Sequence, residues 1–71
     1  MAHMSEVASL LGPRGRCSQI AKELRVHVGT VWSWKDSGSI PHWRRREVLG
    51  AIGRLNIEVP TEVIAYLAQA A

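Results

Sequence analysis

A segment of twenty residues constrains the fold of this chain more than any other, and it reads CSQIAKELRVHVGTVWSWKD, residues 17–36. Apolar residues recur over residues 18–24 at the i, i+1, i+4 spacing of a buried helix face, which predicts a first helix. A second helix is predicted over residues 28–36, because Gly38 follows it and glycine readily adopts the left-handed conformation that ends helices. The short interval between the two segments predicts a tight turn.

The side chains of this segment suit two helices that cross at close range. Ala21 is small enough to let the second helix approach, and Arg25 lies at the bend between the two. The apolar side chains expected to fill the wedge between the helices are Ile20, Leu24, Val26, Val31 and Trp34. The segment therefore predicts a helix-turn-helix.

The rest of the chain is also predicted to be helical. Residues 5–11 have apolar side chains at helical spacing, and Pro41 and Pro60 each introduce a further helix, since proline is favoured at helix starts. The side chains expected to point from these last two helices into the core are Trp43, Val48, Leu49, Ile52, Val63, Ile64 and Leu67. No strand-like alternation occurs, and a single cysteine allows no internal disulfide. The predicted fold class is all-α, a compact bundle of about five short helices around an apolar core.

Positive charge is concentrated in the middle of the chain. Eight arginine or lysine residues lie between Arg14 and Arg46, against only two acidic residues, whereas the whole chain of 71 residues has a net charge of +3. A region whose charges are mostly positive indicates a polyanionic partner, most often a nucleic acid. No apolar run is long enough to span a membrane and no secretory signal is visible, so a cytoplasmic location is expected.

Trp32 and Trp34 point in different directions if residues 28–36 are helical. Two positions separate them, which places the side chains about 200° apart, so they cannot share one core. Trp34 groups on the helical wheel with Val31 and is predicted to be buried, while Trp32 falls on the outer face. The outer position leaves three readings open for Trp32: contact with DNA, an anchor in a protein interface, or a half-buried cap over residues 44–46.

The same residues resemble the helix-turn-helix of the Cro and CI type phage repressors, the lambda-repressor-like family. IAKEL is similar to the first helix of that motif and GTVWSW to its recognition helix, and GSIPHWRRREVLGAI looks like small prophage regulators; together the likeness covers residues 7–56. The chain departs from the family at Arg25, where glycine is usual. A non-glycine residue in the left-handed region costs on the order of 1 kcal/mol, which a good core can tolerate.

The resemblance implies that residues 28–36 enter the major groove and that surrounding basic and polar residues contact phosphates. The residues expected at base edges or in the groove are His27, Val28, Gly29, Thr30, Trp32 and Ser33. The residues expected at phosphates are Arg14, Arg16, Ser18, Gln19, Lys35, Arg44, Arg45 and Arg46. The outer face of the helix has no arginine, asparagine or glutamine for two-bond contacts to a base, so modest base discrimination is expected. A merely solvated basic face is the alternative for the three consecutive arginines.

No catalytic or metal-binding pattern is present in the sequence. The three histidines have no zinc-ligand spacing, and no glycine-rich phosphate loop occurs. Cys17 has no neighbouring base and is expected to be a small residue at a helix start. The chain is therefore expected to be no enzyme and to need no cofactor or metal.

The expected function is a DNA-binding transcriptional regulator of the prophage or mobile-element type, located in the bacterial nucleoid. Residues 1–4 look like a tag remnant, residues 5–56 form the DNA-binding domain, and residues 57–71 form a C-terminal helix that completes the core or dimerises. A module this small is expected to bind double-stranded DNA as a homodimer or as part of a larger chain. The alternative is a protein-interaction module that uses the apolar face around Trp32 to hold RNA polymerase or an antitoxin-type partner.

Overall fold

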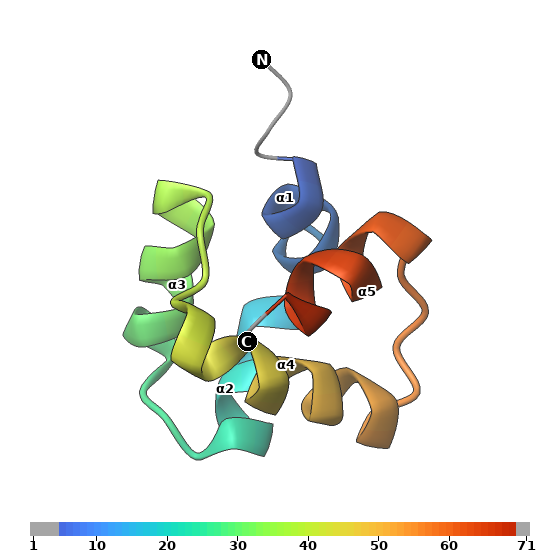
Figure 1. Ribbon diagram of the computed structural model, residues 1–71. Helices are drawn as coiled ribbons and strands as arrows, with labels where there is room; N and C mark the ends of the chain where they lie inside the picture. The colour runs from blue at the N-terminus through green and yellow to red at the C-terminus, as the bar shows by residue number, and fades with distance from the viewer. Residues whose placement is uncertain (1–4, 70–71) are drawn as a thin grey trace.

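The computed structural model describes residues 5–69, and the expected tag remnant at residues 1–4 lies outside the described residues. Its five helices are α1 Ser5–Leu11, α2 Arg16–Leu24, α3 Val28–Ser37, α4 His42–Arg54 and α5 Thr61–Ala68 (Figure 1). No strand occurs within residues 5–69, so the expected all-α class is confirmed. None of the described helices has the length and apolar character that crossing a membrane requires.

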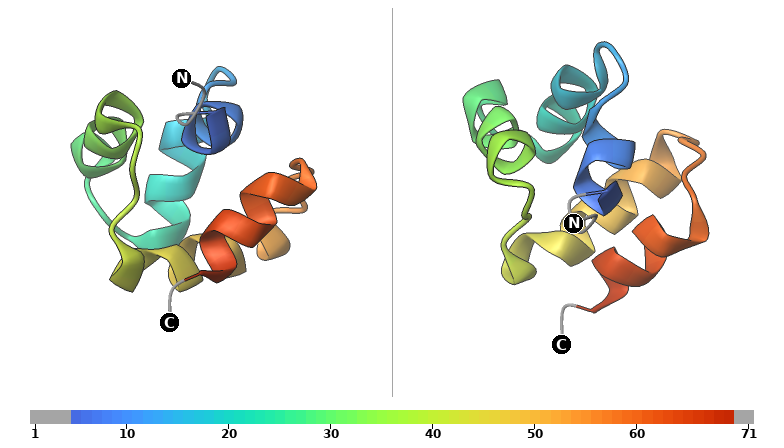
Figure 2. Two further views of the ribbon diagram at one scale, coloured as in Figure 1. Left: turned by 45° about the horizontal axis from the view of Figure 1, so that its top comes forward. Right: turned by 90° about the horizontal axis from the view of Figure 1, so that it is seen from above.

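The helices form a small bundle in which α2 is central. α2 packs against α1, α3 and α4, while α5 lies on α4 and is covered at its other side by α1. Of the described helices, α3 packs only against α1 and α2, and no other helix covers its remaining surface. Figure 2 shows α3 and α5 on opposite sides of the bundle.

One side chain from each helix is fully buried at the centre of the bundle. These side chains are Leu10, Ile20, Val31, Val48 and Leu67, each with an exposed fraction of 0%. Their positions confirm that each of the five helices has an apolar face toward the core. Each such side chain contributes roughly 1.5–3 kcal/mol relative to an exposed position, so the core can stabilise a domain without disulfides.

Residues in the left-handed region end the helices that surround the turn. Arg25 has φ 61° and ψ 42°, and the backbone N–H of Val26 donates to the carbonyl oxygen of Ala21 at 3.0 Å. The backbone N–H of Arg25 donates to the same carbonyl oxygen and to that of Lys22, so residues after α2 close its last turn. Gly38 ends α3 in the same region, with φ 74°. The expected conformations of Arg25 and Gly38 are both confirmed.

Two of the predicted core residues are on the surface. Trp43 has an exposed fraction of 70% and Ile64 of 45%. Trp43 precedes the buried Val48 by five positions, which places it about 140° from the buried stripe of α4. Ile64 lies beside the buried stripe of α5, in which Val63 and Leu67 occupy the inward positions.

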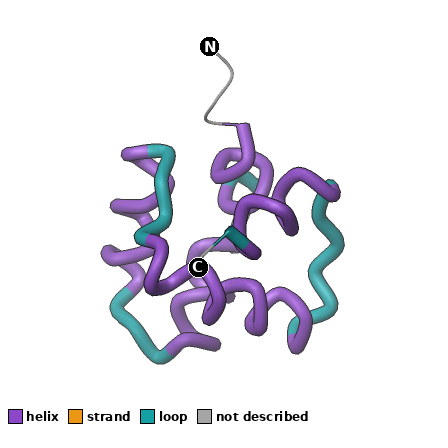
Figure 3. Tube along the Cα trace, in the orientation of Figure 1, coloured by secondary structure: helices purple, strands orange, loops and turns teal. Residues whose placement is uncertain are grey.

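By contrast, Ile40, in the segment between α3 and α4, is fully buried. Its backbone is held by two side chains from other elements. The N–H of Ile40 donates to the hydroxyl oxygen of Tyr66 at 2.9 Å, and its carbonyl oxygen accepts a hydrogen bond from Nε of Arg45 at 2.8 Å. The segment that contains Ile40 returns alongside α3 before α4 begins (Figure 3). These bonds therefore determine where α4 starts relative to α3.

Candidate nucleic-acid interface

The orientation of α3 separates its two tryptophans as the helical wheel predicts. Trp34 is buried, with an exposed fraction of 6%, and packs in the same core as Val31. Trp32 has an exposed fraction of 55%. An outer face of α3 that includes Trp32 is therefore available to a partner.

His27 begins α3 through its side chain. Its Nδ1 accepts a hydrogen bond of 2.9 Å from the backbone N–H of Gly29, which satisfies one of the free donors at the helix start. A Cβ at Gly29 would lie 3.0 Å from that same nitrogen, so glycine at this position leaves room for the cap. The imidazole that was expected to reach a base is thus engaged at the helix end.

The remaining residues expected in the groove lie on or beside the outer face of α3. Thr30 and Ser33 are exposed, while Val28 and Gly29 are partly buried. Asp36, near the end of the helix, is exposed as well. The face offers methyl groups, hydroxyls and one indole, and it includes a carboxylate that would repel phosphate.

The start of α2 differs from the sequence expectation. α2 begins at Arg16, two residues earlier than the predicted boundary, after Gly15 with φ 79°. Nη1 of Arg16 donates to the carbonyl oxygen of Leu10 at 3.0 Å, so this guanidinium ties α2 to the end of α1. Arg14, Ser18 and Gln19 are exposed and remain available.

The three consecutive arginines of α4 have three different environments. Nη1 of Arg44 forms an ion pair of 2.8 Å with Glu47 one turn further along the helix. The guanidinium carbon of Arg45 lies 4.2 Å from the centre of the Tyr66 ring, in addition to its bond to Ile40. Arg46 is exposed. Of the three, only Arg46 matches a simple solvated cation, as do Arg14 and Lys35, two further expected phosphate contacts that are exposed.

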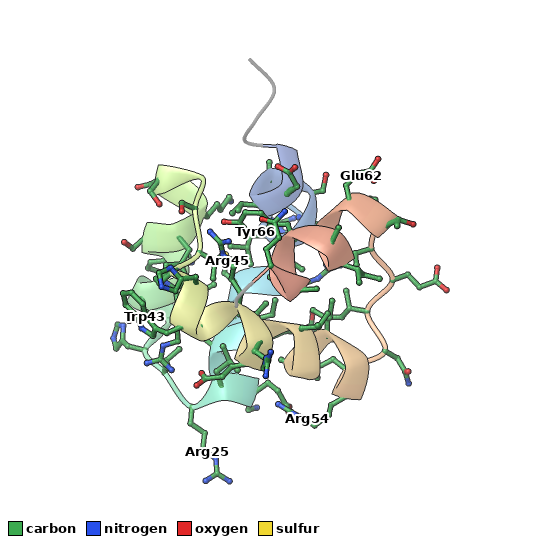
Figure 4. The ribbon with its side chains drawn as sticks, in the orientation of Figure 1. Arg25, Trp43, Arg45, Arg54, Glu62 and Tyr66 are labelled. Carbon is green, nitrogen blue, oxygen red and sulfur yellow. The ribbon has the colours of Figure 1, made fainter. Side chains whose placement is uncertain are left out.

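An open pocket of about 470 Å³ lies between α3 and the start of α4. It is lined by residues of α3, the following segment and α4: Ser33, Ser37, Ser39, His42, Trp43 and Arg45. The rings of His42 and Trp43 meet edge to face with their centres 5.5 Å apart. In Figure 4 Trp43 projects outward beside α3, whereas Arg45 and Tyr66 lie together toward α5.

Sequence reasoning missed this pocket because its parts come from separate elements. Ser39 and His42, which line the pocket, and Tyr66, which packs against Arg45, were not singled out as functional residues, and nothing in the local pattern marks them. The one signal that could have drawn attention to Tyr66 is that it is the only tyrosine of the chain.

Cys17 and the histidines form no reactive cluster in the described region. The thiol of Cys17 is buried and donates to the carbonyl oxygen of Leu11 at 3.7 Å. Burial raises the pKa of this thiol above its ordinary value of 9.0, against a smaller opposing effect of the charge on Lys35. Within residues 5–69 no group of three or more histidine, cysteine or acidic side chains could hold a metal.

The chain has no match among known proteins: no family model, no curated protein and no solved structure matches it. What the surface can do must therefore follow from its own chemistry. It combines an uncovered helix, exposed indoles and basic side chains on three neighbouring helices, which suits a large, anionic ligand with apolar parts.

Proposed function

We propose that this protein is a DNA-binding transcriptional regulator of the prophage or mobile-element type. α3 is the recognition helix and enters the major groove of double-stranded DNA, as in the lambda-repressor-like helix-turn-helix that the sequence resembles. The observation that carries the proposal is the pairing of α2 with α3 across a turn of three residues, with the outer face of α3 left uncovered. We further propose a cytoplasmic location at the bacterial nucleoid.

Basic residues around α3 support the proposal. Arg14 precedes α2, Lys35 lies on α3 itself, and Arg44 and Arg46 lie near the start of α4. With α3 in the groove, cations before and after it face the phosphates of the two strands that border the groove. Ser18 and Gln19, in the first turn of α2, can donate to the same backbone.

Base contacts are expected to be few. Trp32 presents an indole that can pack on a thymine methyl group or a sugar, and Ser33 can donate to either kind of base. The absence of a bidentate donor on this face implies modest discrimination between sequences. Tight binding then requires a homodimer or further domains on the same chain.

The test is binding of the protein to a labelled duplex of random sequence over a series of salt concentrations. Each phosphate neutralised contributes about −0.9 to the slope of log affinity against log salt, so a slope equivalent to several phosphates supports the proposal. Neutralising Arg44 and Arg45 together should reduce the salt slope. Trp32→Ala should weaken binding but leave the salt slope unchanged. Absence of binding at low salt, or wild-type binding by both variants, would refute the proposal.

A second candidate function is favoured by Trp32 and Asp36. Their combination of an exposed indole with a carboxylate on the outer face of α3 suits a protein partner better than it suits DNA alone. In this reading the protein is an interaction module that holds RNA polymerase or an antitoxin-type partner. Loss of a purified partner complex on Trp32→Ala, with no DNA binding at low salt, would favour it.

A further inference from the structure

The pocket between α3 and α4 contains a guanidinium that is fixed in place. Arg45 donates through Nε to the carbonyl oxygen of Ile40, and its carbon lies over the Tyr66 ring. These two contacts hold the planar group against rotation, yet they use only one of its five N–H donors. The remaining donors belong to a side chain that lines the pocket.

The positive charge of Arg45 is not neutralised by the protein. The ion pairs within residues 5–69 join Arg44 to Glu47 and Arg54 to Glu23, and neither includes Arg45. The side chain is also only partly exposed, so water screens its charge less than that of a fully exposed arginine. A fixed, uncompensated cation beside an open pocket favours an anionic ligand.

The other walls of the pocket specify the shape of that ligand. Ser33 and Ser39 bring hydroxyl groups from α3 and from the segment after it, and both residues are exposed. Trp43 also lines the pocket, with 70% of its surface exposed and its ring edge to face with that of His42. A small anion would leave this indole in water, whereas an anion joined to an apolar ring would cover it.

We propose that this pocket binds one phosphodiester group of the DNA strand that borders the groove occupied by α3. The phosphate accepts hydrogen bonds from Arg45 and from the serine hydroxyls, and the adjoining deoxyribose packs against the Trp43 indole. Ser33 belongs both to the pocket and to the outer face of α3, so the pocket continues the surface that meets the groove. The inference rests on the proposed DNA-binding function.

A specific phosphate site at the pocket predicts a result that a non-specific effect of positive charge does not predict. Arg45→Gln and Arg54→Gln remove the same charge from the two ends of α4, but of the two residues only Arg45 lines the pocket. Arg45→Gln is expected to weaken binding to a duplex about tenfold and to lower the salt slope by about one. Arg54→Gln should change both quantities much less, because Arg54 lies outside the proposed DNA-binding surface. Equal effects of the two variants would overturn the pocket, while DNA binding by the wild-type protein would still support the proposed function.

A second pair of variants decides the matter if Arg45→Gln does not fold. Trp43→Ala should weaken binding about fivefold at constant salt slope, because it removes apolar contact and no charge. The effect should be the same on duplexes of unrelated sequence, since a sugar is contacted and not a base. The control is Ile64→Ala, which removes an exposed apolar side chain from α5 on the other side of the bundle. Equal affinities of these two variants would refute the pocket, and no binding by the wild-type protein would refute the pocket and the proposed function together.

Discussion

The hydroxyl group of Tyr66 accepts a hydrogen bond of 2.9 Å from the backbone N–H of Ile40, a residue 26 positions earlier in the chain. The bond joins α5 to the segment that precedes α4, and the Arg45 guanidinium covers the ring of the same tyrosine. A buried residue between two helices would otherwise have an N–H without a partner. Tyr66 is thus a structural requirement for the position of α4 and of the pocket beside it.

Tyr66→Phe should destabilise the protein by about 1–3 kcal/mol, because it leaves the N–H of Ile40 unsatisfied while it retains the aromatic ring beneath Arg45. Unfolding in urea, followed by circular dichroism, measures the change. A variant with an unchanged midpoint would show that water can replace the hydroxyl at this site.

Trp34→Ala should lower the free energy of unfolding by about 3–5 kcal/mol, comparable to the whole stability of a domain this small. Trp32→Ala is the matched control, since the same side chain is removed from the exposed side of the same helix, and a change within about 0.5 kcal/mol is expected. Thermal melting of both variants gives the comparison. Similar melting temperatures would contradict the packing of α3.

Arg25→Gly should stabilise the protein slightly, by about 0.5 kcal/mol. Glycine relieves the left-handed strain at φ 61°, but part of that gain is offset by its greater freedom in the unfolded chain. Lys22→Gly, within α2, is the control and should destabilise by about 1 kcal/mol, because its backbone is helical. Urea unfolding distinguishes the two, and destabilisation by Arg25→Gly would mean that the arginine side chain contributes more than its strain costs.

Cys17 predicts a decline in stability at alkaline pH. Burial raises the pKa of its thiol in the folded state above 9.0, so the folded protein holds its proton where the unfolded chain has released it. The contribution is therefore fully present below about pH 9 and is lost as the pH rises further through the folded-state pKa. Cys17→Ala should show a flatter dependence of stability on pH above about pH 9 in urea unfolding. Parallel curves for the two proteins would show that the thiolate is as well accommodated in the fold as in water.

Much of this protein follows from short-range patterns in its sequence. The helices, the end of α2 at Arg25, the end of α3 at Gly38 and the opposite directions of Trp32 and Trp34 depend on residues a few positions apart. Helical periodicity and turn chemistry act over that range, so the sequence alone predicts them. The resemblance to a helix-turn-helix rests on the same local features.

Only the tertiary structure decides what surrounds α3. The burial of Ile40 and the fixed orientation of Arg45 depend on Tyr66, which approaches from the last helix. Such contacts arise from the packing of elements that are distant in the chain, and no local period records them. The sequence by itself thus determined that α3 has an outer face, whereas the packing of α4 and α5 determined that Arg45 and Trp43 lie beside it.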